Sequence, residues 1–323
     1  MVDIHRHLDG NIRLSTIIDL AQANGVELPS YQVSGLAEHV YISDKTSDLL
    51  AFLQKLDMGV SVLSTLDACK RIAFENVEDA VNEGLHHVEL RFSPYYMAMA
   101  FKLPLTEVVA AVVAGVEEAN QTFNYHATLI GILSRTFGTD ACMHELDALL
   151  QHKDKLKAVD LAGDELGFPA KLFVPHFNKV KDAGLNITIH AGEASGPESI
   201  WDAIRLLHAD RIGHAVAAHA DLALMDYMAS NQIGIESCLL SNYQTGTWLN
   251  MATHPVTIFL KHHIPVCINT DDPGVSNNTL KSEYQLAKNV VGLSMPQILT
   301  LQNNALQQAF LSAKEKDAIL ASL

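Results

Sequence analysis

Residues with metal-binding or acid–base side chains gather at the ends of four short apolar segments of this sequence. They occur in the runs His5-Arg6-His7, His190-Ala191-Gly192-Glu193, Gly213-His214 and Asn269-Thr270-Asp271-Asp272. Residues i and i+2 of a β-strand share a face, so His5 and His7 can bind one metal ion together. Adding His190 and Asp271 gives three imidazoles and a carboxylate. Such a set suits zinc, and a catalytic zinc keeps one position open for water.

The other polar residues at these segment ends have two interpretations each. Beside a metal-activated water, Glu193 is placed as a general acid or base; alternatively, it is a loop carboxylate ahead of a helix near Pro197. His214 is a fourth ligand, a second base or a buried structural histidine, and spacing does not choose between these. Asp271 and Asp272 are adjacent carboxylates at the end of an apolar strand, and burying both costs free energy unless each has a binding partner. Asp272 is therefore expected to contact substrate or, alternatively, to cap a helix.

The elements that position these residues follow from periodicity. Segments between the strands are amphipathic: the valines in Thr106–Ala119, for example, follow a helical period. Regular β–α alternation predicts a parallel sheet, and eight repeats favour a closed (β/α)8 TIM-type barrel, whose strand ends meet at one face. The eight expected strands are Val2–His5, Leu85–Phe92, Ala127–Ser134, Ala158–Ala162, Ile187–His190, Arg211–His214, Ile233–Ser237 and Pro265–Asn269.

One long excursion interrupts this alternation. Residues 24–80, between the first two strands, read as mostly helical, and in a barrel they would emerge over the mouth as a lid. The tail is expected to form helices over Lys281–Val291 and Met295–Leu323 that complete the outer ring. Because no Gly/Ser-rich linker or internal repeat divides the chain, we expect residues 1–323 to form a single barrel domain.

Composition excludes several classes of protein. The 323 residues are 48% hydrophobic and 18% charged, which argues against disorder. Acidic residues outnumber basic ones by 37 to 22, and the net charge of −15 argues against nucleic acid as a partner. No apolar run approaches the roughly 20 residues that span a bilayer, and the N-terminus lacks the features of a signal peptide. The four cysteines form no C-x-x-C motif. We therefore expect a cytoplasmic protein with no membrane partner.

Five motifs in order give this chain a resemblance to a known family. HRHLDG (5–10), DLAGDE (160–165), HAGE (190–193), GHA (213–215) and NTDDP (269–273) resemble the adenosine deaminase family of the metal-dependent amidohydrolase superfamily. FLQKLD (52–57), RFSP (91–94) and SNYQTGTW (241–248) are also similar to this family, and SRTFG (134–138) resembles its bacterial members. The resemblance extends from residue 2 essentially to the C-terminus.

The resemblance implies a role for each candidate residue. Glu193 corresponds to the proton donor to purine N1, and His214 to the histidine that orients and helps activate the water. Asp272 corresponds to the partner of N7, Gly163 to the glycine whose N–H meets N3, and Asp9 to the carboxylate that binds the ribose 5′-hydroxyl. Phe52, Leu53 and Leu56 fall on the hydrophobic lid helix. One Zn²⁺ per chain would be held by His5, His7, His190 and Asp271.

The implied reaction is hydrolytic deamination of adenosine and 2′-deoxyadenosine to inosine and 2′-deoxyinosine, with release of ammonia, in purine salvage. Zinc lowers the pKa of bound water to about 7, and protonation at N1 makes the ring electron-poor at C6. One departure from the family stands out, because its usual GHG is GHA here, with Ala215.

Alternatives come from the same superfamily and from outside it. Deaminases of adenine or aminofutalosine carry HLEG where this chain has HLDG, and the shorter Asp9 leaves room for ribose. An AMP deaminase would need basic residues near Asp9, where only Arg6 and Arg13 are close in sequence. The cytidine deaminase signature has no counterpart here. A binuclear amidohydrolase usually has a bridging lysine at the end of strand four, and this strand has no lysine there. A catalytically inactive barrel is disfavoured because every expected metal ligand and Glu193 are present.

Overall fold

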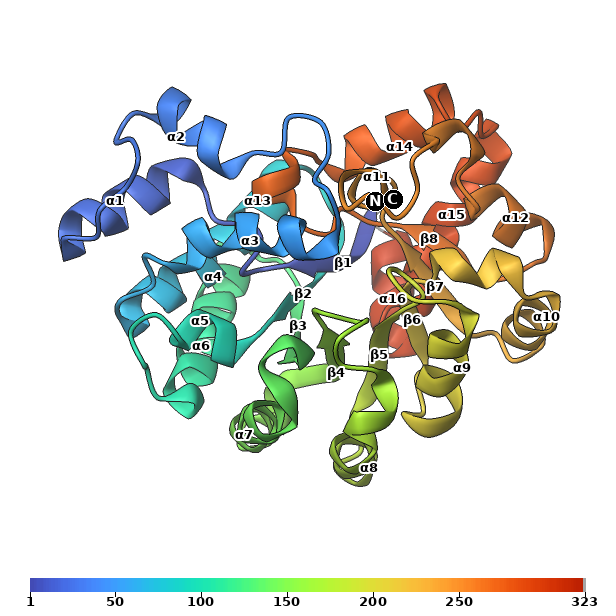
Figure 1. Ribbon diagram of the computed structural model, residues 1–323, viewed down its shortest axis with the longest axis horizontal. Helices are drawn as coiled ribbons and strands as arrows, with labels where there is room; N and C mark the ends of the chain where they lie inside the picture. The colour runs from blue at the N-terminus through green and yellow to red at the C-terminus, as the bar shows by residue number, and fades with distance from the viewer. Residues whose placement is uncertain (322–323) are drawn as a thin grey trace.

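The computed structural model describes residues 1–321, and its centre is one sheet of eight parallel strands (Figure 1). Each strand pairs with the next one along the chain, in the order β1 to β8. Nearly every strand residue is buried, because helices cover the outer face and side chains fill the inside. The strands are β1 (Val2–His7), β2 (His87–Phe92), β3 (Ala127–Ser134), β4 (Leu156–Ala162), β5 (Asn186–Ala191), β6 (Arg211–His214), β7 (Gly234–Ser237) and β8 (Val266–Ile268).

The first and last strands close the barrel through a short contact just beyond β8. An isolated parallel bridge joins Arg6 to Asp271. The backbone N–H of His7 donates to the carbonyl of Asp271 at 2.8 Å, and the N–H of Asp271 donates to the carbonyl of His5 at 2.9 Å. The prediction of a (β/α)8 barrel is confirmed. Its closure also fixes Asp271 beside the two histidines of β1.

The outer ring consists of helices that pack an apolar face on the strands. In α6 the buried residues include Val108, Val109, Val112, Val113 and Val116, which is the predicted helical pattern. The helices after β2 are α5 (Pro94–Ala98), α6 (Leu105–Phe123), α7 (Gly138–Leu150), α8 (Val174–Asp182), α9 (Pro197–Leu206), α10 (Leu222–Ser230), α11 (Leu239–Gln244), α12 (Val256–Lys261), α13 (Pro273–Ser276), α14 (Leu280–Asn289), α15 (Met295–Gln308) and α16 (Ala313–Ala321).

The segment between β1 and β2 contains four helices, of which α4 joins the outer ring and α3 lies over the barrel. They are α1 (Leu14–Asn24), α2 (Val33–Val40), α3 (Leu49–Val60) and α4 (Leu66–Asn82). Helix α4 packs against α6 and β2 and therefore belongs to the outer ring. Helix α3 is capped at its N-terminus by Asp48, whose carboxylate accepts the N–H of Ala51 at 2.9 Å, and the helix lies across the barrel in Figure 1.

The prediction of one continuous helix from Met295 was wrong, because the chain breaks between α15 and α16. The break places Gln308 and Phe310 against charged groups of the barrel. Arg211 donates to the carbonyl of Gln308 at 2.8 Å and lies 3.6 Å from the Phe310 ring, and the Phe310 N–H donates to Glu89. These contacts need the helix to end. The last two residues of the expected helix lie outside the described part of the chain.

The described residues also bear on the membrane and cysteine predictions. Within residues 1–321, no helix is both long and apolar enough to cross a membrane. All four cysteines are buried and free, as expected of small hydrophobic residues in the core.

Candidate metal centre and active site

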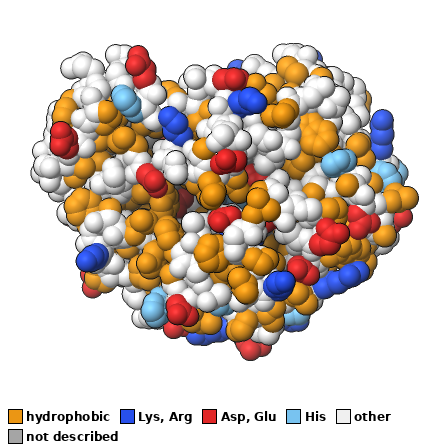
Figure 2. Space-filling view, viewed as in Figure 1, with side chains coloured by type: hydrophobic (Ala, Val, Ile, Leu, Met, Phe, Trp, Pro, Cys, Tyr) orange, Lys and Arg blue, Asp and Glu red, His pale blue; other side chains and the backbone are white. Residues whose placement is uncertain are grey.

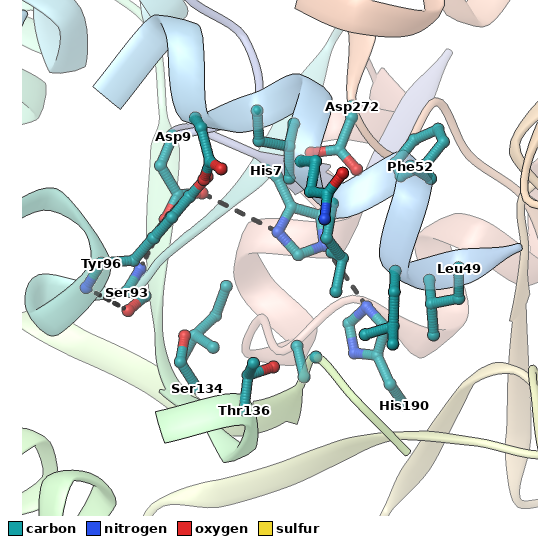
Figure 3. A pocket seen from close by; sticks show the side chains of 18 of the residues that line it. His7, Asp9, Leu49, Phe52, Ser93, Tyr96, Ser134, Thr136, His190 and Asp272 are labelled. Atoms are coloured by element: carbon teal, nitrogen blue, oxygen red, sulfur yellow. Dashed lines mark hydrogen bonds and ion pairs between the residues drawn. The ribbon is translucent and has the colours of Figure 1, made fainter. Parts of the chain in front are cut away.

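Three histidines and one aspartate converge at the carboxyl ends of the strands. Nε2 of His7 on β1 lies 3.3 Å from Nε2 of His190 on β5, and a dashed line joins the two rings in Figure 3. Oδ1 of Asp271, beyond β8, lies 3.1 Å from Nε2 of His5 and 3.3 Å from Nε2 of His7. One ligand atom of each residue lies within 4.8 Å of those of the others. The structure therefore brings together all four residues predicted from the sequence as metal ligands.

Two buried carboxylates fix the orientation of His5 and His190. Nδ1 of His5 lies 2.7 Å from Glu236, and Nδ1 of His190 lies 3.0 Å from Asp160. Arg91 is fully buried between these carboxylates and donates to each of them at 2.8 Å. With Nδ1 bonded to a carboxylate, each ring turns its Nε2 lone pair toward the cluster.

The protonation states in this network favour metal binding. Burial alone would raise the pKa of Glu236, but Arg91 and Arg211 hold it well below its usual value. The pKa of Asp160 is also lowered, because His190 and Arg91 outweigh the effect of burial. Burial lowers the pKa of His190 to about 3. Ionised carboxylates therefore face a neutral imidazole, which is the form that binds a metal.

The centre of the cluster fits a cation. Among the residues that the structure describes, Nε2 of His5 is buried without a well-aligned hydrogen-bond partner. Burial would lower the pKa of His7, but the carboxylates of Asp272 and Asp271 raise it to about 9. The surroundings of His7 thus favour a positive charge. Three imidazole nitrogens and one carboxylate are a ligand set that zinc accepts.

His214 lies at the end of β6, beside the cluster. Its Nε2 is 3.8 Å from both Glu193 and Asp271. The amide of Asn242 donates to Nδ1 of His214 at 3.0 Å, so the neutral ring carries its proton on Nε2. Burial lowers the pKa of His214, which favours that neutral form. His214 also belongs to a second possible ligand set with Cys238, but that set shares two residues with the first.

The backbone at His214 explains the glycine that usually follows it in the resembling family. His214 and Ala215 both have left-handed backbone conformations, with φ of 61° and 50°. Glycine adopts this region without a steric penalty, whereas alanine does so at a cost of about 1–2 kcal/mol. Ala215 is fully buried, so packing around its methyl group offsets part of that cost.

Glu193 follows β5 and points its carboxyl group toward His214. Burial raises the pKa of Glu193 well above its usual value, and the charges of Asp271 and Glu165 raise it further. The shift favours the protonated carboxyl group, which can donate a proton, a property expected of a general acid.

Asp272 projects into the same region from the end of the barrel closure. Its pKa is raised well above the usual value, by burial first and then by Asp271, Asp9 and Glu193 against the opposing effect of His7. Gly10 makes room for this carboxyl group, because a Cβ atom on Gly10 would lie 1.7 Å from Oδ1 of Asp272. The final glycine of the HRHLDG motif thus has a steric reason.

Asp9 and Gly163 lie at other edges of the site. The carboxylate of Asp9 accepts the N–H of Ser93 at 2.8 Å and lies 3.8 Å from Nδ1 of His7, on the side of His7 away from His190 (Figure 3). Gly163 has φ of 106°, a conformation that side chains rarely allow, and a Cβ there would lie 2.4 Å from Oγ1 of Thr136. The backbone of Gly163 can therefore approach a ligand closely.

One cavity of about 360 Å³, a size typical of small-molecule sites, is lined by eight of the site residues: His7, Asp9, Gly163, His190, Glu193, His214, Asp271 and Asp272. Among the residues described, no lysine or arginine lines it. Figure 2 shows hydrophobic and acidic side chains around a hollow near the middle of this face. Helix α3 supplies an apolar wall, which consists of Leu49, Leu50, Phe52, Leu53 and Leu56. The predicted excursion therefore contributes directly to the cavity.

Comparison with known proteins identifies the family. The family model described as adenosine deaminase matches residues 1–323. The chain is 57% identical over 319 residues to an adenosine deaminase of Shigella dysenteriae, a match that covers 99% of this chain and 96% of the relative. The chain belongs to the adenosine deaminase family. The resemblance seen in the motifs is thereby confirmed, and the protein is a member of an enzyme family.

Solved structures of more distant relatives share the fold. The adenine deaminase of Arthrobacter aurescens matches with a TM-score of 0.90 at 26% identity, covering 99% of this chain and 96% of that one. The N6-mAMP deaminase of Arabidopsis matches with a TM-score of 0.85 at 26% identity, with the same coverage. The barrel is therefore shared by proteins named for a base and for a nucleotide, so fold alone does not select the substrate.

The sequence did not reveal the roles of several residues that hold the metal ligands and His214 of this chain in position. Arg91 and Asp160 fall within the RFSP and DLAGDE motifs, so their positions were visible but their partners were not. A glutamate inside the apolar strand β7 was a usable signal for Glu236, since a buried charge needs a partner. Asn242 offered no signal beyond its place in SNYQTGTW.

Gly10→Ala is expected to lower deaminase kcat/KM without unfolding the protein. The new methyl group would displace Asp272, and a displacement near 1 Å can reduce the rate by about 10²-fold. Steady-state kinetics and thermal unfolding would be measured together. Gly84→Ala is the control, because Gly84 has φ of 71° and nothing within 4 Å of a Cβ, so it should affect stability only. Gly10→Ala activity within twofold of wild type would contradict the steric argument.

Proposed function

We propose that this protein is a zinc-dependent adenosine deaminase. It converts adenosine and 2′-deoxyadenosine, with water, to inosine and 2′-deoxyinosine plus ammonia, and serves purine nucleoside salvage in the cytoplasm. The observation that carries the proposal is the cluster of three imidazoles and Asp271 beside a cavity that Glu193, a carboxyl group with a raised pKa, also lines. Relatives 57% identical to this chain are named adenosine deaminases, which supports the same assignment.

The proposed cofactor is one Zn²⁺ ion per chain. The ligands would be His5, His7, His190 and Asp271, because three imidazoles and one carboxylate suit that ion. When bound, zinc lowers the pKa of water to about 7 and so supplies hydroxide at neutral pH. Glu236 and Asp160 hold two of the ligand rings in position.

The protein's own residues supply the remaining acid–base chemistry. Addition of hydroxide at C6 of the purine needs an electron-poor ring, which Glu193 provides by donating its carboxylic proton to N1. His214 carries a proton on Nε2 and lies close enough to Glu193 and Asp271 to orient the attacking water. The raised pKa of Asp272 favours its protonated form, which can donate to N7. The N–H of Gly163 can donate to N3, and His7 lies against the bound ring.

Charge at the far end of the cavity favours a nucleoside over a nucleotide. The carboxylate of Asp9 suits the ribose 5′-hydroxyl as an acceptor and repels a phosphate. Asp57, on α3, is a second carboxylate lining the cavity, and its Oδ1 accepts the hydroxyl of Tyr96 at 2.7 Å. A phosphate would meet these carboxylates with no lysine or arginine in the described lining. Deamination of adenine or of aminofutalosine is the alternative, and the substrate comparison below separates adenine from our proposal.

We also propose that the barrel works as one domain over residues 1–323, with a lid from residues 24–80. Within that segment the contact surface is α3, whose Phe52, Leu53 and Leu56 face the cavity. Their apolar side chains would exclude water around the purine and so strengthen the polar contacts.

The metal assignment predicts close to one zinc per chain in purified protein and loss of activity on chelation. His190→Ala should abolish tight binding, because it removes one of four ligands. His39→Ala, at an exposed position of α2, is the matched control and should retain zinc. Elemental analysis after dialysis measures both. Two tightly bound metals per chain would point to a binuclear site instead.

Glu193→Gln keeps the side-chain shape but removes the carboxylic proton. We expect kcat to fall by the ~10²–10⁴-fold typical of general acid–base catalysis. Zinc content should stay at the wild-type level, since Glu193 is not a proposed ligand. A variant whose kcat lies within tenfold of wild type would remove Glu193 from the mechanism.

Substrate choice is tested by ultraviolet difference spectra with adenosine, 2′-deoxyadenosine, AMP and adenine. The two nucleosides should be turned over, whereas AMP and adenine should be poor substrates. Asp9→Ala should reduce kcat/KM for adenosine, because it removes a hydrogen bond to a charged group. Such a bond contributes about 1.5–3 kcal/mol. Adenine never makes that contact, so the preference for adenosine should narrow. Equal losses for both substrates would show that Asp9 supports the metal histidines instead, and faster turnover of adenine would overturn the proposed substrate.

A further inference from the structure

A second glutamate, which has no part in the chemistry proposed above, binds the loop that carries Glu193. Glu165 lies in the loop after β4 and is 3% exposed. Its Oε2 accepts the backbone N–H groups of Glu193, Ala194 and Ser195 at 3.1, 2.7 and 3.0 Å. Its Oε1 accepts the N–H of Gly192 at 2.6 Å and the hydroxyl of Ser199 at 2.5 Å. One carboxylate thus satisfies four successive peptide groups.

This arrangement determines the path of the loop. Residues 192–195 lie between β5 and α9, so their N–H groups have no ladder or helix to join, and buried N–H groups need partners. Successive N–H groups that point to one side form a concavity suited to an anion. The first residue of this loop must be glycine, because Gly192 has φ of 67° and a Cβ there would lie 2.4 Å from Ile200.

We infer that Glu165 is a positioning residue for the deamination reaction, which holds the main chain of residues 192–195 so that the Glu193 carboxyl group is directed at N1 of the purine. This inference rests on the proposed function and adds a residue to it. Glu165 acts through the backbone and does not touch the substrate. The charge of Glu165 also contributes to the raised pKa of Glu193.

Glu165→Gln is the variant that separates this role from simple space filling. Glutamine has nearly the same shape, but one of its two acceptor oxygens becomes an NH₂ group that faces backbone donors. The loop would therefore lose some of its anchors while the core stays filled. The matched control is Glu198→Gln, the same substitution at an exposed position in the first turn of α9.

We expect Glu165→Gln to lower kcat for adenosine by about 10–100-fold, since misplacement of a reacting group by 1 Å can cost about 10²-fold. KM should change less than about threefold, because the groups that bind the nucleoside remain. Zinc content should be unchanged. Glu198→Gln should match wild type within twofold. An effect of Glu165→Gln on KM or zinc content alone, or a kcat within twofold of wild type, would overturn the inference.

A double-mutant cycle gives the decisive comparison. If Glu165 acts through the Glu193 carboxyl group, Glu165→Gln should lower kcat less than about threefold when Glu193 is already glutamine. The same loss in both backgrounds would show a general structural role and overturn the inference. Should Glu165→Gln fail to fold, Ser199→Ala replaces it in the cycle. It should reduce kcat two- to fivefold in the wild-type background only, and no reduction there would count against the inference.

Amide hydrogen exchange provides a readout that needs no turnover. Glu165→Gln should speed exchange at residues 192–195 while the strands of the barrel keep their protection, and unchanged exchange would overturn the inference. Failure of the proposed function would look different, because the wild-type protein itself would then not deaminate adenosine.

Discussion

The site depends on a buried chain of charges in which Arg91 joins Asp160 to Glu236. Each carboxylate orients one histidine of the cluster, and the arginine keeps both carboxylates ionised inside a core that would otherwise favour their neutral forms. Charges buried this deeply are tolerated only when they are paired and hydrogen-bonded. Arg211 extends the chain from Glu236 to Glu89 and the segment before α16. The ligand geometry is thus tied to the whole length of the barrel.

Barrel closure and site assembly are the same structural event. Asp271 makes the bridge between the end of β8 and β1 with its backbone, and it faces His5 and His7 with its side chain. Around it the carboxyl groups divide into two classes. The neighbouring histidines lower the pKa of Asp271, whereas burial beside other carboxylates raises the pKa of Glu193 and of Asp272. One group of side chains thereby supplies both a ligand and proton donors.

Periodicity predicted all eight strands, because parallel strands buried on both faces have a strong apolar signature. The positions of His5, His7, His190 and Asp271 at the ends of these strands then predicted that the four side chains converge. Periodicity could not predict that α15 ends at Gln308, because the cause is a contact of Phe310 with Arg211, far away in sequence. The anchoring roles of Arg91 and Glu165 were hidden for the same reason. A buried charge is visible in a sequence, but its partner is visible only in the fold.

The position of the bound metal is the most direct test of the proposed active site. Anomalous diffraction at the zinc edge, from crystals of protein purified without added metal, would locate it. We predict a single strong peak bounded by His5, His7, His190 and Asp271. A peak displaced toward Cys238 and His214, a second peak of similar strength, or no peak at the cluster would contradict the account.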